Sequence, residues 1–190
     1  MNSYKRDYAR PDLKIYSRLI RFRDFVYRRF SIFPESKFIT LVQKSTKHSE
    51  HPSIIENFDS FYLYAKNNSR NFTVNKVTWF HMSIEEQVRL IANTKVLFSL
   101  PGSDLMNAVF LPNNAAIIVP ERLYGGKWQA SNEIRLWFRH RLDLYIDHFR
   151  PNATCKGNNS IEINLEDTWS RIQRGAIHEY ISPIVRVRLG

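Results

Sequence analysis

The chain has little of three things that often reveal what a protein does: cysteine, long apolar runs and catalytic signature motifs. Cys155 is its only cysteine, which excludes an intrachain disulfide and leaves the redox compartment open. No stretch approaches the length of a membrane span, and the charged N-terminus, MNSYKRDYARPDLK, lacks the apolar core of a signal peptide. Neither a P-loop nor a Gly-x-Ser-x-Gly motif occurs, so NTPases and hydrolases of the usual kinds are excluded.

The histidines show no spacing typical of a metal site. No H-x-x-x-H pair occurs and no cysteine pairs with them, although a zinc site needs three or four ligands of these types. The histidines are His48, His51, His81, His140, His148 and His178. We therefore expect no metal ion, and nothing in the sequence indicates another cofactor.

What the chain does have is enough apolar residues for a core, and a positive charge. Hydrophobic residues make up 43% of it and aromatic residues 14%, which indicates a folded chain rather than a disordered one. A length of 190 residues favours a single domain. The formal net charge of +10 favours anionic partners, and nucleotide diphosphates, nucleic acid and acidic membranes all qualify. No RNA-binding signature, zinc module or helix-turn-helix adds support for nucleic acid.

Residues 95–121, KVLFSLPGSDLMNAVFLPNNAAIIVPE, predict a compact βαβ unit. Lys95–Leu100 is a short apolar run without helical periodicity, as expected of a buried strand, and Ala115–Val119 is a second one. Gly102 permits a tight turn after the first strand. A helix should follow this turn, because four apolar residues recur at helical spacing. They are Leu105, Met106, Val109 and Phe110.

The start of this predicted helix is the first candidate for a binding site. We expect Ser103 or Asp104 to cap it. A helix N-terminus gathers unpaired N–H groups and the positive end of the helix dipole, which suits a phosphate group. The alternative is an ordinary turn between a strand and a helix of a parallel sheet, with no ligand.

Strands and helices alternate along the rest of the chain. Ser83 and Glu86 form the pattern of a capping box before a helix at 84–93. The other predicted helices are 13–30, 53–66 (a weaker one), 127–140 and 165–179, and the other predicted strands are 38–43, 72–79 and 142–146. This alternation predicts an α/β, Rossmann-like fold, with a mainly parallel sheet and helices on both faces. Ligands of such sheets lie beyond the carboxyl ends of the strands.

The region around the βαβ unit resembles the C-terminal half of glycosyltransferase family 61, which includes the EGF-domain O-GlcNAc transferase and plant xylan arabinosyl- and xylosyltransferases. The family pattern runs Ser-x-Glu-Glu-Gln, a strand, His-Gly-Ala-x-Leu-x-Asn, x-x-Phe-Leu-Pro and a second apolar strand. The matching residues are Ser83, Glu85, Glu86, Gln87, Gly102, Leu105, Asn107, Phe110, Leu111 and Pro112. Weaker similarity extends the family-like region to 13–150 and leaves 151–190 as a C-terminal strand and helix extension.

Four positions depart from the family pattern. Pro101 stands where the family has histidine, Ser103 where it has alanine, and Val119 where an acidic or amide residue is common. Lys44 replaces an arginine after the first strand, and lysine lacks the bidentate fork with which arginine holds a phosphate. The fold tolerates these changes easily, whereas activity is sensitive to them.

The resemblance implies the donor-binding half of a GT-B glycosyltransferase, which transfers a sugar from a UDP-sugar to a hydroxyl of a glycan or protein. It also implies the lumen of the endoplasmic reticulum or Golgi, although no signal sequence is present. Because little of the family's acceptor half is found and Pro101 replaces the histidine, we expect a partial or degenerate copy. The alternatives are a catalytically inactive glycosyltransferase-like binding domain and, with less support, a basic nucleic-acid-binding protein.

The candidate nucleotide-sugar site combines the turn with loops that follow other strands. Glu121 follows a strand end, where a carboxylate can accept ribose hydroxyls, and Lys44 and Lys47 can neutralise phosphate charge. Asn107 has either a role in this site or a hydrogen bond to a neighbouring loop, and Glu86 either a supporting role or only its capping box. The nucleotide-sugar-binding candidates are Lys44, Gly102, Ser103, Asp104, Asn107 and Glu121. The sequence names no catalytic base.

Sequons of the form Asn-x-Ser/Thr mark candidate glycosylation sites. They begin at Asn67, Asn71, Asn152 and Asn158. Glycosylation of such sites takes place in the secretory pathway, so the sequons agree with the lumenal location that the resemblance implies.

Overall fold

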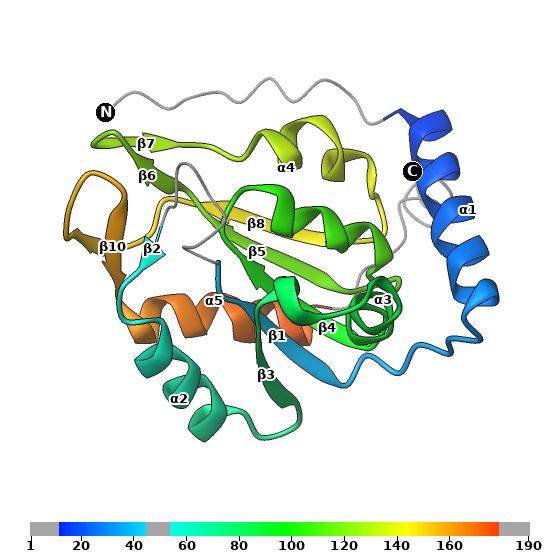
Figure 1. The fold of residues 1–190 in the computed structure, drawn as a ribbon, viewed down its shortest axis with the longest axis horizontal. Coiled ribbons are helices and arrows are strands. Elements are labelled where there is room, and N and C mark those ends of the chain that lie inside the picture. Colours follow the sequence, from blue (N-terminus) through cyan, green and yellow to red (C-terminus); the bar gives the residue numbers. More distant parts are fainter. Residues whose placement is uncertain (1–11, 45–53, 179–190) are drawn as a thin grey trace, which may run out of the picture.

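The main sheet is parallel, as the sequence predicts. We describe it from a computed structural model, whose described residues are 12–44 and 54–178. Within them, five parallel strands lie in the order β3-β1-β4-β5-β8 (Figure 1). Their bounds are Thr73–Val77 for β3, Phe38–Val42 for β1, Thr94–Ser99 for β4, Ala116–Pro120 for β5 and Tyr145–Phe149 for β8. The strands predicted at 95–100 and 115–119 are the paired neighbours β4 and β5, so the Rossmann-like prediction is confirmed.

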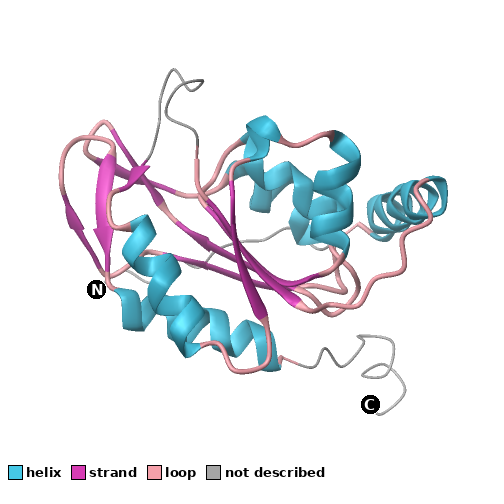
Figure 2. Ribbon diagram, turned by 60° about the horizontal axis from the view of Figure 1, so that its bottom comes forward, coloured by secondary structure: helices cyan, strands magenta, loops and turns pink. Residues whose placement is uncertain are grey.

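Helices cover both faces of this sheet (Figure 2). One face carries α2 (Phe58–Asn68) and α5 (Leu165–Ile177), and the other carries α3 (Ile84–Ala92), the 3-10 helix η2 (Ser103–Phe110) and α4 (Asn132–Leu136). Successive strand residues point to opposite faces, so Leu41 joins the core beneath α2 and α5 while Val42 joins the core beneath α3 and η2. Farther out, α1 (Leu13–Arg29) packs on α3 through Tyr27.

Two smaller sheets were not predicted, although a strand and a helix were expected within 151–190 and are present there as β10 (Ser160–Ile163) and α5. One of these sheets consists of β2 (Ile54–Ile55), β9 (Ala153–Cys155) and β10, and the other of β6 (Arg122–Tyr124) and β7 (Lys127–Gln129). β6 and β7 form a hairpin around Gly125 and Gly126, whose φ angles are 55° and 73°. Two consecutive positive φ angles are typical of a tight hairpin turn. The helix predicted at 127–140 is therefore wrong in its first part, and only α4 and the 3-10 helix η3 (Phe138–His140) remain of it.

Other element boundaries differ by a few residues. The helix predicted at 53–66 starts later, as α2, because β2 pairs with β10 before it. The strand predicted at 142–146 is β8, and a 3-10 helix, η1 (Trp79–His81), follows β3. Lys47 lies outside the described residues, as does most of the loop after β1. None of the helices in the described part of the chain is long and apolar enough to cross a membrane.

A buried ion-pair network holds the end of η2 in place. The buried Arg141 side chain donates to both carboxylate oxygens of Asp143, at 2.9 and 2.7 Å. It also donates to the carbonyl oxygens of Val109 and Leu111, at 2.8 and 2.9 Å. Arg23 of α1 donates to the same Leu111 carbonyl at 3.3 Å. Because a buried charge is costly unless it is paired, the network fixes the position of the helix that follows the candidate turn.

Candidate functional site

The carboxyl ends of β1, β4 and β5 lie at one edge of the sheet, because these strands are parallel neighbours. Lys44 follows the end of β1, Pro101 and Gly102 follow β4, and Glu121 comes directly after β5. The fold therefore brings candidate residues from three loops to the edge at which parallel sheets bind their ligands.

A contact between Lys44 and the Gly102 turn links two of these loops. The Lys44 ammonium donates to the carbonyl oxygen of Pro101, with an Nζ–O distance of 3.4 Å. Gly102 has a φ of 139°, which residues with side chains rarely adopt. A Cβ atom at this position would lie 3.0 Å from Nζ of Lys44. The backbone conformation therefore favours glycine, and an added Cβ would in addition make the end of the Lys44 side chain shift.

The charges of Lys44 and Asp104 partly offset one another. Burial lowers the pKa of Lys44, the Asp104 carboxylate opposes this shift, and weaker effects come from Arg122, which lowers the pKa, and Glu133, which raises it. Burial raises the pKa of Asp104, and Lys44 opposes that shift. Burial is the largest influence on both pKa values. The attraction between the two charges therefore does not cancel the effect of burial. An anion at this edge would gain from Lys44 and meet repulsion from Asp104.

The helix after the turn lacks the side-chain cap predicted for Ser103 or Asp104. Gly102 is the N-cap residue, and no side chain accepts a hydrogen bond there. Because η2 is a 3-10 helix, its first turn is closed by the backbone, with the Leu105 N–H donating to the Gly102 carbonyl at 3.0 Å. The first N–H groups of a helix have no acceptor within it, and here they belong to Ser103 and Asp104.

Asn107 has a hydrogen-bond partner inside the protein. Its side-chain amide donates to Oε1 of Gln87 at 2.9 Å, and the Gln87 amide donates to the carbonyls of Met82 and Trp79 at 2.9 and 3.3 Å. The Trp79 indole N–H donates to the carbonyl of Asp104 at 3.1 Å. These bonds tie η2 to α3 and η1. The structure thus gives Asn107 a supporting bond, to a helix rather than to a loop, and its contact with a nucleotide stays a prediction.

Glu86 forms the predicted capping box. The Ser83 N–H donates to Oε2 of Glu86 at 2.7 Å, and the Glu86 N–H donates to the Ser83 hydroxyl oxygen at 3.2 Å. Hydrogen bonds with the side chain and backbone of Ser83 lower the pKa of Glu86, so its carboxylate stays ionised at the start of α3. A role for Glu86 at the nucleotide site stays a prediction.

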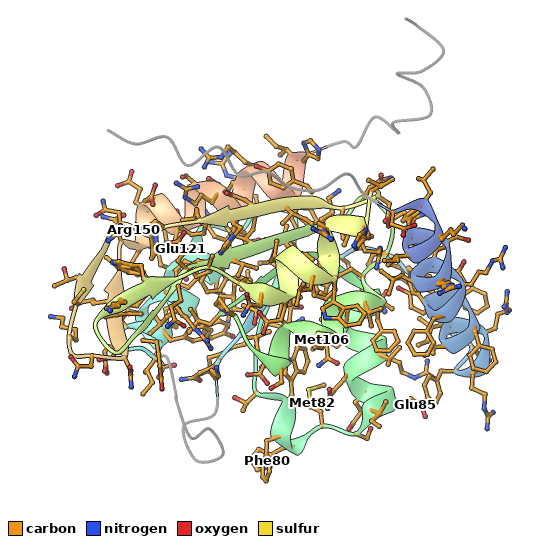
Figure 3. The ribbon with its side chains drawn as sticks, turned by 90° about the horizontal axis from the view of Figure 1, so that it is seen from above. Phe80, Met82, Glu85, Met106, Glu121 and Arg150 are labelled. Carbon is orange, nitrogen blue, oxygen red and sulfur yellow. The ribbon has the colours of Figure 1, made fainter. Side chains whose placement is uncertain are left out.

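Glu121 and Arg150 follow the last residues of β5 and β8, which pair with each other. The Glu121 N–H donates to the carbonyl of Phe149 at 2.7 Å, and Figure 3 shows the Glu121 and Arg150 side chains at the same end of the sheet. The Arg150 guanidinium lies 5.2 Å from the ring centroid of Trp128. Sequence reasoning missed Arg150 and Arg122. The signal that marks both is a charged residue at, or close to, the carboxyl end of a strand.

The described residues offer cations rather than metal ligands at this edge. In residues 12–44 and 54–178, no three side chains of His, Cys, Asp or Glu come together as a metal site. Among the described residues, Lys44 is the positive group beside Gly102, and Arg122 is close enough to affect its pKa. That the protein needs no metal or other cofactor stays a prediction.

Comparison with protein families agrees with this geometry. The family model of Glycosyltransferase 61 matches residues 12–118. The match contains β1, β3 and β4, together with the candidate residues from Lys44 to Asn107, and it ends within β5 before Glu121. No curated protein matches the chain.

Proposed function

Because the chain belongs to glycosyltransferase family 61, we propose that it binds a UDP-sugar at the carboxyl edge of its sheet and transfers the sugar to a hydroxyl of a glycan or protein. The observation that carries the proposal is the position of the Lys44 ammonium against the Gly102 turn. An ammonium group lies beside the residue that precedes the first N–H groups of a helix, and this combination suits a diphosphate.

The nucleotide would use loops after three strands, as in the donor half of a GT-B enzyme. Lys44 would pair with the diphosphate, the N–H groups of Ser103 and Asp104 would donate to its oxygens, and Glu121 would accept the ribose hydroxyls. The Asp104 carboxylate weakens such a site by repulsion. Arg122, which lies close enough to lower the pKa of Lys44, offsets it with a second positive charge.

The proposed chemistry is an inverting displacement. The acceptor hydroxyl oxygen forms a bond to the anomeric carbon, while the bond from that carbon to the diphosphate breaks and UDP leaves with the electron pair. A general base takes the hydroxyl proton, and we assign no residue to this role. Lys44 and the N–H groups of the first turn would stabilise the charge that develops on the leaving UDP.

A domain that binds but does not catalyse is the second candidate, and Pro101 is the observation that favours it. Proline offers neither a backbone N–H nor a side-chain donor, whereas the family pattern has a histidine at this position. Loss of one preorganised donor costs about 10²- to 10³-fold in rate in other enzymes. UDP binding through backbone N–H groups does not need that side chain and would persist.

Binding is tested by thermal unfolding with UDP and with uridine. We expect UDP to raise the melting temperature and uridine to have little effect, because the diphosphate meets Lys44. Lys44→Met should remove most of the effect of UDP, whereas Lys66→Met, at an exposed position on α2, should leave it unchanged. No stabilisation by UDP would overturn the proposal, and salt-sensitive binding of single-stranded nucleic acid in its place would favour the nucleic-acid alternative.

Transfer is tested separately, with UDP-GlcNAc and UDP-xylose as donors, on the unmodified chain and on Pro101→His. We expect slow transfer by the unmodified chain and faster transfer by the variant. UDP binding without transfer in either protein would establish the inactive domain. Robust transfer by the unmodified chain would show that Pro101 does not impair catalysis.

A further inference from the structure

A second candidate site lies at the opposite edge of the sheet, in a cavity of about 420 Å³. The cavity lies where α2 and α5 end and where β1 and β3 begin, with Ile39 and Phe72 in its wall. Strands of five residues place the two edges of the sheet roughly 16 Å apart. The cavity therefore does not belong to the candidate nucleotide site.

The cavity combines a buried aromatic floor with exposed amides. Trp169 is only 5% exposed and Phe72 is half-buried, whereas Asn67, Asn71 and Gln173 are exposed. Side-chain amides donate and accept hydrogen bonds, and sugar hydroxyls do the same. An apolar surface with a few convergent polar groups is the usual composition of a small-molecule site, and this volume lies in the usual range.

Trp169 also carries an unpaired hydrogen-bond donor. Its indole N–H is buried and has no partner among the described residues. Because its Nε1 atom has almost no accessible surface, a ligand in the cavity would contact the Trp169 ring rather than this N–H, and the indole signal would report that contact.

The charge around the cavity disfavours ionic ligands. The C-terminal ends of α2 and α5 present the negative ends of two helix dipoles, which oppose phosphates and carboxylates. Arg70 lines the cavity and opposes cations, and none of the described residues that line it carries a carboxylate. We propose that this cavity binds a neutral sugar residue of a glycan. The proposal uses no residue of the candidate nucleotide site and does not depend on it.

The test uses the full chain made in bacteria, which leaves the sequons unmodified, and contains no nucleotide. Chitotriose, xylotriose and mannotriose are each titrated against nitrogen-15-labelled protein. We expect saturable shifts of the Trp169 indole signal with at least one of them. The double variant Arg70→Ala/Gln173→Ala changes two exposed side chains and should weaken binding about tenfold or more. Arg174→Ala, on α5 but outside the cavity, should bind like the unmodified chain.

Two results would overturn the proposal: no saturable shift with any of the three trisaccharides, or a shift that the double variant leaves unchanged. Comparison of each variant's own spectrum with that of the unmodified chain shows whether that variant remains folded. Because the titrations contain no UDP, failure of nucleotide binding would not affect them.

The sugar can come from a separate glycan or from the protein itself, since Asn67 and Asn71 line the cavity and begin sequons. Protein secreted by eukaryotic cells, with its glycans trimmed to single N-acetylglucosamine residues, distinguishes the two sources. If the attached sugar is the occupant, this protein should no longer bind the free trisaccharide, whereas the same chain made in bacteria, which carries no attached sugar, should bind it. Unchanged binding by the glycosylated protein would identify a separate glycan as the ligand.

Discussion

Replacing Gly102 with alanine tests whether the turn after β4 is both a structural and a binding element. Its φ of 139° lies outside the regions open to residues with side chains, and strain of this kind costs about 1–3 kcal/mol. The added Cβ would lie 3.0 Å from Nζ of Lys44, but the far end of a lysine side chain can move away at little cost. For a chain of this length we expect the melting temperature to fall by about 2–12 °C.

The displacement of Lys44 is what makes this variant informative about binding. If the ammonium has to leave its position beside the Pro101 carbonyl, UDP loses a charge-assisted hydrogen bond worth about 1.5–3 kcal/mol. Its affinity should then fall roughly 10- to 150-fold. Isothermal calorimetry measures that affinity, and denaturant titration at the same temperature measures the free energy of unfolding.

Gly157→Ala is the matched control. The φ of Gly157 lies outside the positive range, and a Cβ there would meet only the Ser160 hydroxyl, at 3.4 Å. This variant should change the free energy of unfolding by less than about 0.5 kcal/mol and leave UDP binding unchanged. If the glycine acts through Lys44, the double variant Gly102→Ala/Lys44→Met should bind UDP little worse than Lys44→Met alone. A Gly102→Ala protein with unchanged UDP affinity would refute the reasoning.

The charged groups lead to four further expectations. Arg141→Met should lower the free energy of unfolding by about 3 kcal/mol in denaturant titrations, because it removes the close partner of buried Asp143 and leaves Arg23, 3.7 Å away, as the one ion-pair partner among the described residues. A loss below about 1 kcal/mol would show that the network is not needed for stability. Asp104→Asn should tighten UDP binding roughly two- to fivefold in calorimetry, because it removes a negative charge from the diphosphate site, and weaker binding would contradict this placement. Since burial lowers the pKa of Lys44 and only its ammonium form pairs with UDP, affinity should be constant at neutral pH and fall as alkaline pH rises through that lowered pKa. A pH-independent affinity would exclude Lys44 as the partner. A chelator should leave UDP affinity unchanged, and a loss on its addition would reveal a required metal.

The parts of the fold that follow from local sequence could be predicted. β4 and β5 are apolar runs limited by proline, glycine and asparagine, and the capping box of Ser83 and Glu86 marks the start of α3. The β6–β7 hairpin could not, because strands of three residues are too short to show an alternating pattern. Only Gly125 and Gly126 mark it, and the positive φ of both is visible only once the strands pair.

The position of the candidate site could be predicted better than its contacts. Its position depends on where parallel strands end, which the alternation of elements indicates. Its contacts join residues far apart in the sequence, such as Lys44 with the Pro101 carbonyl and Asn107 with Gln87. The buried partners of Arg141 could not be predicted either, since in sequence this arginine resembles any surface charge until η2 packs over it.

The residues that match the family pattern and those that depart from it have different tasks in the structure. Gln87 and Asn107 bond to each other and tie η2 to α3, and Glu86 caps α3, so these matches hold the shape of the turn. Pro101 and Lys44 depart from the pattern, and both lie at the edge where we propose that a diphosphate binds. The matching residues therefore support the shape of the turn, whereas UDP binding and transfer by this chain stay predictions. A binding measurement tests the shape, and only the transfer assay with Pro101→His tests the chemistry.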